Sequence, residues 1–171
     1  MPAADHREQA KQPVTCAVIT VSDTRTEAND TSGRTMREKL EAAGHKVGYY
    51  AIVKDEPEQI TKLLEDLSTK GQVQAVLLNG GTGISRRDNT YEAVTGLLEK
   101  RLDGFGELFR MLSFQEIGAA AMLSRALAGT FRDLIVFSTP GSTAAVRLAM
   151  DKLIVPELAH LVWELWRQKQ A

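Results

Sequence analysis

The stretch Leu77-Leu78-Asn79-Gly80-Gly81-Thr82-Gly83-Ile84-Ser85-Arg86-Arg87-Asp88 runs from an apolar segment directly into three glycines, two arginines and a carboxylate. Because glycine has no Cβ, the backbone N–H groups of such a turn can approach an anion closely. A helix that begins just after the turn points the positive end of its dipole at the same place. The order of residue types therefore predicts a buried strand, a turn that holds an anionic group, and a helix.

This glycine segment differs from the two common nucleotide-binding fingerprints. A Gly-x-Gly-x-x-Gly motif requires glycine at the position of Arg86, and a Gly-x-x-x-x-Gly-Lys-Ser/Thr loop requires a lysine that the segment lacks. The residues thus argue against a Rossmann-type dehydrogenase and against a P-loop nucleotidase. They leave a phosphorylated ligand whose identity the segment alone does not specify.

Apolar runs and amphipathic segments alternate on both sides of the glycine segment. Strands are expected at residues 14–21, 47–53, 73–78 and 134–137. Helices are expected at residues 31–43, 57–71 and 90–102, at about 105–128 with a break near Gly118, and at 143–169 with an interruption at Pro156. Nearly all-apolar strands that alternate with helices indicate an α/β protein, an open parallel sheet with helices on both faces.

Polar turns follow all four expected strands, and in an open parallel sheet they share the rim where ligands bind. Ser22 and Asp23 follow the first strand, residues 54–56 the second, the glycine segment the third and residues 138–142 the fourth. Asp, Gly, Ser and Pro are common in turns of every kind, so each turn taken alone is explained by turn propensity. Four such turns on one rim are what an enzyme site of this class requires.

Two of these turns contribute the carboxylates Asp55 and Asp88, each just before an expected helix. Each is explained as a helix cap or as a partner of the helix dipole. Two carboxylates from neighbouring strand ends also suit Mg²⁺, which prefers oxygen ligands and bridges to substrate phosphates. Phosphoryl and nucleotidyl transfer depend mostly on positioning and charge neutralisation. Lys54, Arg86 and Arg87 are candidate cations for this role, with solvated turn residues as the alternative.

Composition limits the remaining possibilities. The 171 residues suit one domain, expected at residues 13–171, with a disordered arm at residues 1–12. A formal net charge of −1 provides no long-range field that attracts nucleic acid or an anionic membrane. No apolar run approaches the ~20 residues of a membrane span, and the first residues do not resemble a signal peptide. A cytoplasmic protein is expected.

The few sulfur and imidazole side chains do not indicate a metal site. Cys16, the single cysteine, lies in an apolar run that predicts a buried, unreactive thiol rather than a nucleophile. The three histidines have no ligand spacing among them, which argues against zinc. Trp163 lies off the apolar stripe of the last expected helix, so it suits either a subunit contact or local packing.

Spaced motifs cover most of the chain, at residues 21–24 (VSDT), 30–33 (DTSG), 53–56 (VKDE), 80–83 (GGTG), 87–93 (RDNTYEA), 104–118 and 140–142 (PGS). Together they resemble the molybdopterin-binding family, which includes molybdenum cofactor biosynthesis protein B, molybdopterin adenylyltransferase and the N-terminal domain of gephyrin. Residues 104–118 are most similar to the protein B branch. The resemblance implies a three-layer α/β/α sandwich with a mostly parallel sheet, assembled as a homotrimer or homohexamer.

The resemblance also implies a ligand and a reaction. The family binds molybdopterin, a dithiolene-bearing pterin phosphate, and its adenylyltransferases transfer AMP from Mg²⁺-ATP to the terminal phosphate with release of pyrophosphate. Asp55 and Asp88 match the catalytic, Mg²⁺-handling carboxylates. The positions that match the ligand cradle are Ser22, Asp23, Asp30, Ser32, Gly80, Gly81, Thr82, Gly83, Thr90, Glu92, Ser113, Pro140, Gly141 and Ser142.

The sequence departs from the family pattern at Asn79, where threonine is common, and at Thr143, where proline is frequent. Neither departure removes a charge that the chemistry needs. Some members of the protein B branch lack one acidic residue and turn nothing over, whereas this sequence retains both carboxylates. An adenylyltransferase is therefore expected, with other cofactor-assembly enzymes as partners. The alternatives are a molybdopterin carrier without turnover and a generic nucleotide-binding module.

Overall fold

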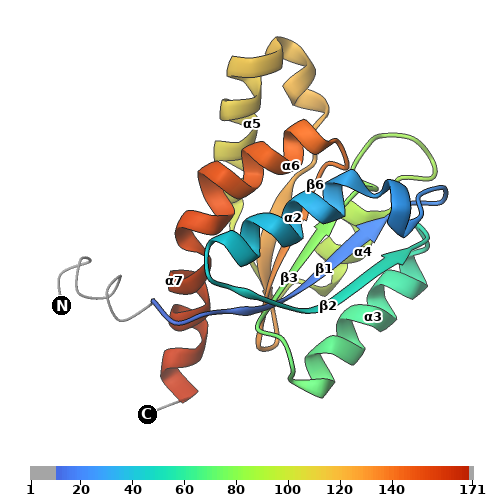
Figure 1. Ribbon diagram of the computed structural model, residues 1–171. Helices are drawn as coiled ribbons and strands as arrows, with labels where there is room; N and C mark the ends of the chain where they lie inside the picture. Colours follow the sequence, from blue (N-terminus) through green and yellow to red (C-terminus); the bar gives the residue numbers. More distant parts are fainter. Residues whose placement is uncertain (1–10, 170–171) are drawn as a thin grey trace.

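The computed structural model describes residues 11–169, which form one six-stranded sheet between layers of helices (Figure 1). The expected N-terminal arm lies almost wholly outside the described residues. The strands are β1 (Thr15–Val21), β2 (Lys46–Val53), β3 (Ala75–Asn79), β4 (Lys100–Arg101), β5 (Leu127–Phe131) and β6 (Leu134–Thr139). The α-helices are α2 (Thr31–Ala42), α3 (Pro57–Lys70), α4 (Thr90–Leu97), α5 (Asp103–Ile117), α6 (Thr143–Ala149) and α7 (Val155–Trp166).

The strands lie in the order β2-β1-β3-β6-β5-β4. β1 pairs in parallel with β2 and β3, and β3 pairs in parallel with β6. β5 runs antiparallel to β6, and the two-residue strand β4 runs antiparallel to β5. The predicted open, mostly parallel sheet is confirmed, and its carboxyl-end rim is formed by the four strands that the sequence indicated.

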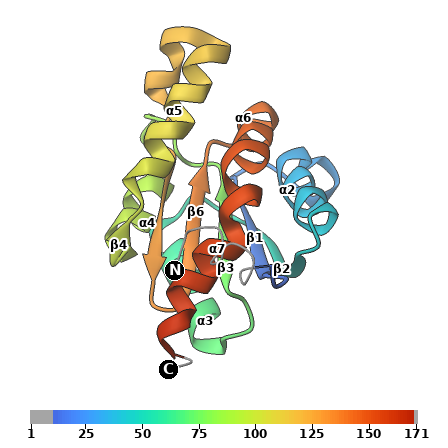
Figure 2. The same ribbon diagram turned by 90° about the vertical axis from the view of Figure 1, so that its left-hand side faces the viewer.

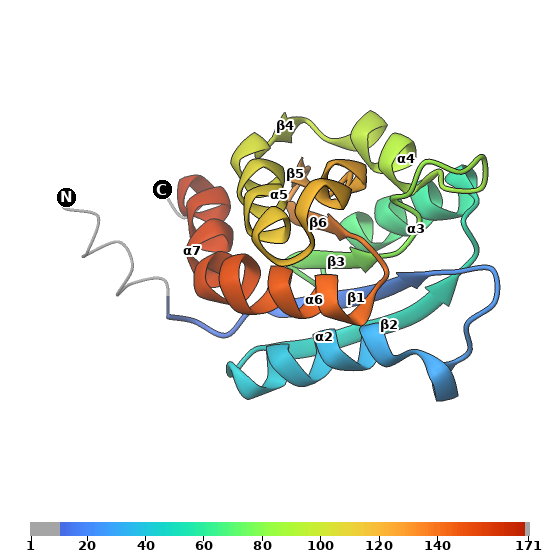
Figure 3. The same cartoon turned by 90° about the horizontal axis from the view of Figure 1, so that it is seen from above.

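Helices cover both faces of the sheet, as Figure 3 shows for α2 and α6 on one side and α3 and α4 on the other. Each face has its own apolar cluster, one beneath α2, α5, α6 and α7 and the other beneath α3 and α4. Consecutive residues of β3 serve opposite clusters, since Leu77 packs in the first and Leu78 in the second. Each such burial stabilises the fold by about 1.5–3 kcal/mol, which explains why the strands are continuously apolar.

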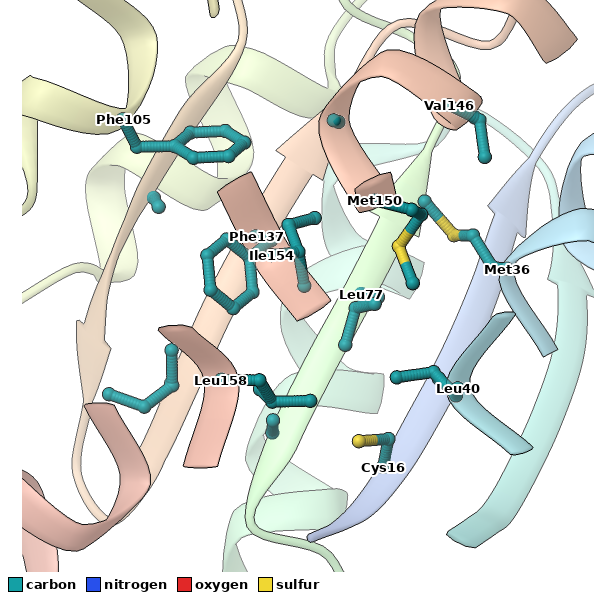
Figure 4. Packing of buried hydrophobic residues seen from close by; sticks show 14 of the residues in the cluster. Cys16, Met36, Leu40, Leu77, Phe105, Phe137, Val146, Met150, Ile154 and Leu158 are labelled. Atoms are coloured by element: carbon teal, nitrogen blue, oxygen red, sulfur yellow. The ribbon is translucent and has the colours of Figure 1, made fainter. Parts of the chain in front are cut away.

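Cys16 of β1 belongs to the first cluster, part of which Figure 4 shows. Its side chain is fully buried, and burial raises the pKa of the thiol to about 12. The prediction that this cysteine is buried is therefore confirmed. No helix in the described chain is long and apolar enough to cross a membrane.

The expected helices at residues 90–102 and 105–128 are wrong in their last parts. The helix α4 ends at Leu97, after which Lys100 and Arg101 form an edge strand, and residues 127 and 128 begin β5. β5 contains Ala128 and Gly129, which carry little intrinsic strand signal, and its hydrogen bonds to β6 decide its conformation. Gly129 is required there, because a Cβ would lie 2.3 Å from the carbonyl oxygen of Lys100.

The interruption expected at Pro156 appears as a π-helical turn, η3 (Met150–Ile154), that joins α6 to α7. Pro156 has no N–H to donate, so it lies in the first turn of α7, where none is needed. Trp163 stacks against His160, with ring centroids 6.5 Å apart, and the guanidinium of Arg167 covers its ring. Trp163 thus makes the local packing contacts that one of the two alternatives required.

Candidate functional site

A pocket of about 350 Å³ opens at the rim where β3 and β6 end. One wall is the glycine segment and another is the turn after β6. The outer wall is α5 with the 3₁₀ segment η2 (Gly118–Leu123), which stand beyond the end of the sheet (Figure 2). The lining residues are Gly80, Gly81, Thr82, Gly83, Asp88, Phe109, Ser113, Ile117, Ala120, Leu123, Ser124, Pro140, Gly141, Ser142 and Ala145.

The glycine segment turns sharply because two of its residues adopt left-handed backbone conformations. Gly80 has φ 98° and Gly81 has φ 70°, values that other residues rarely adopt. A Cβ on Gly80 would lie 2.2 Å from the carbonyl oxygen of Val21, and one on Gly81 would lie 2.5 Å from Oδ2 of Asp55. The turn is therefore pressed against β1 and against the Asp55 carboxylate.

Asp55 is 5% exposed and lies in the turn between β2 and α3. Its side chain does not cap α3, the helix that the capping alternative concerned. Its Oδ1 instead accepts hydrogen bonds at the start of α4, from the N–H of Asn89 (3.1 Å) and the hydroxyl of Thr90 (3.4 Å). Burial raises the pKa of the Asp55 carboxyl, the two hydrogen bonds offset part of that shift, and the nearby Asp88 and Asp23 raise the pKa further. The surroundings of Asp55 thus disfavour the ionised form of its carboxyl group.

Asp88 closes the segment that follows the glycines. Its Oδ2 accepts the N–H of Ser85 at 3.0 Å, and a Cβ on Gly83 would lie 2.6 Å from the same oxygen. The two carboxylates therefore lie against the same short loop, Asp55 at Gly81 and Asp88 at Gly83. Oδ2 of Asp55 and Oδ1 of Asp88 accept no hydrogen bond from the described residues.

This donor set fits a magnesium ion that takes few ligands from the protein. In residues 11–169 no three or more His, Cys, Asp or Glu side chains form a cluster that could hold a metal ion by themselves. Mg²⁺ is commonly held by one or two carboxylates, with water and substrate phosphates completing its octahedral shell. The uncommitted oxygens of Asp55 and Asp88 provide that number of ligands.

Arg87 ties three of the rim turns together. Its guanidinium donates to Asp23 at 2.9 and 2.8 Å and to Glu56 at 2.9 Å. Oδ1 of Asp23 also accepts the N–H of Asp55 at 3.2 Å. The Arg87 guanidinium holds the pKa of the Asp23 carboxyl below its usual range. The Arg87 guanidinium is thus engaged in ion pairs. Lys54, Arg86 and Arg87 are all exposed to solvent.

Six of the fourteen predicted cradle positions do not line the pocket, namely Ser22, Asp23, Asp30, Ser32, Thr90 and Glu92. Asp30 is 0% exposed, and its carboxylate accepts the Thr20 hydroxyl (2.7 Å), the Tyr50 hydroxyl (2.6 Å) and the N–H of Gly33 (2.9 Å). Ser32 is equally buried and donates to the carbonyl of Gly141 at 2.7 Å. Ser22 accepts N–H groups of residues 24 and 25. These side chains shape the rim from behind.

Other predicted positions either line the pocket or support the residues that do. Ser113 faces the pocket from α5, and Ser142 lines it while its hydroxyl caps α6 by accepting the N–H of Ala145 at 3.2 Å. Thr90 is buried and donates its N–H to the carbonyl of Gly81 at 3.1 Å. The prediction that these strand-end turns meet at one rim is confirmed.

Sequence reasoning missed Arg125, which contacts the glycine segment from behind. It lies between η2 and β5, inside a stretch that was expected to be helical. Its guanidinium donates to the carbonyls of Thr82 and Gly83 and to the Glu92 carboxylate. An isolated arginine just before an apolar stretch was the only available signal, because its acceptors are mostly backbone atoms and leave no mark in the sequence.

Comparison with known proteins gives consistent relatives. The family described as "probable molybdopterin binding domain" matches residues 17–160. Molybdenum cofactor biosynthesis protein B of Bacillus cereus is 54% identical over 169 residues, which cover 98% of this chain and 100% of that protein. Protein B of Bacillus subtilis is 54% identical over 170 residues, covering 99% and 100%.

Solved structures agree with these sequence relatives. A crystal structure of molybdenum cofactor biosynthesis protein B has a TM-score of 0.89 at 55% identity and covers 92% of this chain and 99% of that chain. The tungsten cofactor synthesizing protein MoaB from Pyrococcus furiosus has a TM-score of 0.82 at 37% identity and covers 90% and 98%.

Proposed function

This chain belongs to the molybdopterin-binding family of molybdenum cofactor biosynthesis proteins, and on that premise we propose that it adenylylates molybdopterin with Mg²⁺-ATP. The observation that carries the proposal is the pair Asp55 and Asp88. The two carboxylates lie against one glycine loop at the edge of the pocket. Each has one oxygen that accepts no hydrogen bond from the described residues. A protein that only bound the pterin would not need this pair.

In the proposed reaction, an oxygen of the terminal molybdopterin phosphate attacks the α-phosphorus of ATP. A new P–O bond forms, the bond from the α-phosphorus to the oxygen bridging to the β-phosphate breaks, and pyrophosphate leaves with that electron pair. Mg²⁺, held by Asp55 and Asp88, would supply neutralisation of the phosphate charges. The chain itself binds and orients, with the glycine loop against phosphate and the apolar side of α5 against the pterin.

The electrostatics of Asp55 support this assignment. Its carboxylate is buried beside two other carboxylates, and the pKa of Asp55 is raised as a result. Sites that receive a cation are commonly built from charges that lack full compensation in the empty protein. The resemblance further predicts assembly into a homotrimer or homohexamer, a cytoplasmic location and contacts with other cofactor-assembly enzymes.

The decisive experiment supplies the purified protein with molybdopterin and Mg²⁺-ATP. We expect adenylylated molybdopterin and pyrophosphate in equal amounts. Omission of Mg²⁺ is expected to abolish pyrophosphate release while leaving molybdopterin binding measurable. Tight molybdopterin binding without pyrophosphate above background would remove the enzyme assignment.

A carrier or assembly protein without turnover is the second candidate, and one observation favours it. Large apolar side chains are exposed on α5 and η2 beside the pocket mouth, including Met111 (51%), Phe114 (61%) and Met122 (76%). A cluster of this kind marks a surface that contacts another protein. Such a surface suits transfer of the pterin between proteins, whether or not the protein also modifies it.

A further inference from the structure

The side chain of Arg125 is placed to control the shape of the glycine loop. We propose that Arg125 is a positioning residue, which holds residues 82–88 so that the loop N–H groups and the Asp88 carboxylate face the ligand. This inference deepens the proposed adenylyltransferase site and rests on that proposed function for its effect on turnover. Its structural part, the control of the loop, stands independently.

The contacts of Arg125 converge on the loop from one side. Nε donates to the carbonyl of Thr82 at 3.0 Å, and Nη2 donates to the carbonyls of Gly83 and, at 3.3 Å, Asp88. The remaining contacts go to the Glu92 carboxylate, which pairs with Nη1 and lies 3.4 Å from Nη2. One guanidinium therefore holds three loop carbonyls and one carboxylate together.

Holding the carbonyls fixes the direction of the N–H groups. In a planar trans peptide the C=O and the following N–H point in opposite directions. Because the carbonyls of residues 82 and 83 point at Arg125, the N–H groups of Gly83 and Ile84 point away from it. Neither N–H donates to a backbone or side-chain acceptor within the described residues. Free N–H groups of successive residues are the arrangement that cradles an anion.

The same contacts fix Asp88. Its backbone carbonyl is bound by Arg125, while its side chain accepts the N–H of Ser85. Loss of the guanidinium would therefore release the chain on both sides of the Asp88 carboxylate. Arg125 acts through these groups and does not itself line the pocket.

Arginine suits this task better than lysine. A guanidinium has five N–H donors in one plane, whereas an ammonium is a compact charge with three donors on a single atom. The Glu92 carboxylate keeps the guanidinium plane in place, and the Tyr91 ring lies beneath it, 4.8 Å from Cζ to the ring centroid. The Arg125 side chain is 24% exposed, so water competes only partly for these contacts.

The test compares Arg125→Ala and Arg125→Lys with a matched control, Arg110→Ala. Arg110 donates to the carbonyls of Ser124 (3.5 Å) and Ala126 (3.2 Å), which flank Arg125, but it contacts no residue of the glycine loop. Its loss removes a similar brace from the same connection. Two readouts are taken on the full-length protein, namely amide hydrogen exchange without ligand and steady-state pyrophosphate release.

In Arg125→Ala we expect the hydrogen-bonded loop amides, those of Ser85 and Asp88, to exchange at least about tenfold faster, with the central strands unchanged. We expect kcat to fall about 100-fold while KM for ATP changes much less, because misplaced groups act on the transition state. Arg125→Lys should recover part of kcat. Arg110→Ala should leave both loop exchange and kcat as in the unmodified protein.

Two results would overturn the inference. One is loop exchange in Arg125→Ala equal to that of the unmodified protein. The other is a loss of kcat, per folded molecule, that is equal in Arg125→Ala and Arg110→Ala. If the unmodified protein releases no pyrophosphate, the proposed function fails instead. Loop exchange and molybdopterin affinity in the three variants then still decide the role of Arg125.

Discussion

The two polar walls of the pocket are held in opposite ways. The glycine wall, residues 80–88, is held largely by the charged side chains of Arg87 and Arg125, which remain partly in contact with water. The serine wall, formed by residues 140–142, is held from behind by the buried Ser32 of α2, whose hydroxyl donates to the Gly141 carbonyl. The buried Asp30 carboxylate caps the start of that helix. A buried polar network is stable only when all its members are paired, whereas exposed ion pairs break singly and re-form. The glycine wall is therefore the part of the pocket that can change its conformation, and the serine wall is the rigid part.

The largest expected effect is a loss of the proposed reaction when a carboxylate of the glycine wall is removed. Asp88→Ala removes one of the two carboxylates proposed for Mg²⁺ and should lower the rate of pyrophosphate release by about 10²–10³-fold. Molybdopterin affinity should change little, because the carboxylate is assigned to the metal. Pyrophosphate release and equilibrium pterin binding measured on one preparation check both statements. A variant with unimpaired turnover would remove Asp88 from the proposed site.

The next largest expected effect is a loss of stability when the hydrogen bonds behind the serine wall are removed. Asp30→Ala leaves the buried hydroxyl of Thr20, the half-buried hydroxyl of Tyr50 and the N–H of Gly33 without their acceptor. The free energy of unfolding should fall by about 3 kcal/mol or more, as expected for several unpaired buried groups. Urea denaturation measures this change.

Tyr50→Phe is the matched milder change in the same network, because it removes one partner of Asp30 and leaves the acceptor in place. Its cost should be about 1 kcal/mol. Equal losses for Asp30→Ala and Tyr50→Phe would contradict a network in which Asp30 is the central acceptor. In the unmodified protein, burial and the hydrogen bond to Asp30 raise the pKa of Tyr50 to about 12.

A smaller effect separates stability from function at Asp55. Because the pKa of Asp55 is raised in the folded state, its contribution to stability is fully present below the unfolded pKa of about 3.9 and is lost as pH rises through the folded value. Asp55→Asn, which stays neutral, should therefore be more stable than the unmodified protein at neutral pH without Mg²⁺, and less active. Thermal melts at several pH values measure the difference, which should disappear in acid. A variant less stable at neutral pH would contradict this reasoning.

The smallest effect concerns the exposed bridges of Arg87. Arg87→Ala should lower stability least of these variants, since its partners Asp23 and Glu56 remain solvated. The difference from the unmodified protein should vanish near ~1 M salt, where charges are screened beyond about 3 Å. Melting temperatures at low and high salt test this. A difference that persists at high salt would mean that the glycine wall is as rigid as the serine wall.

The sequence predicted those parts of the fold that its own periodicity encodes. Continuous apolar runs marked β1, β3 and β6, and the glycines after β3 marked the rim. β5 was missed because its small residues form a strand only through pairing with β6. Asp55 and Asp88 were predicted from their place in strand-end turns, and the structure places both carboxylates against the glycine loop. Arg125 escaped notice since backbone carbonyls, its main acceptors, are present at every residue and create no pattern.

The burial of Cys16 has a consequence for sulfur chemistry at the pocket. The chain has one cysteine, and its thiol, buried in β1 with a pKa of about 12, is not converted to thiolate at neutral pH. A mixed disulfide forms when a thiolate attacks an existing disulfide, so an oxidised, disulfide form of a dithiolene ligand meets no cysteine thiolate of the folded chain that could capture it. Such a ligand would enter and leave without a reductant, and reaction of Cys16 with a thiol reagent would report unfolding rather than occupancy of the pocket.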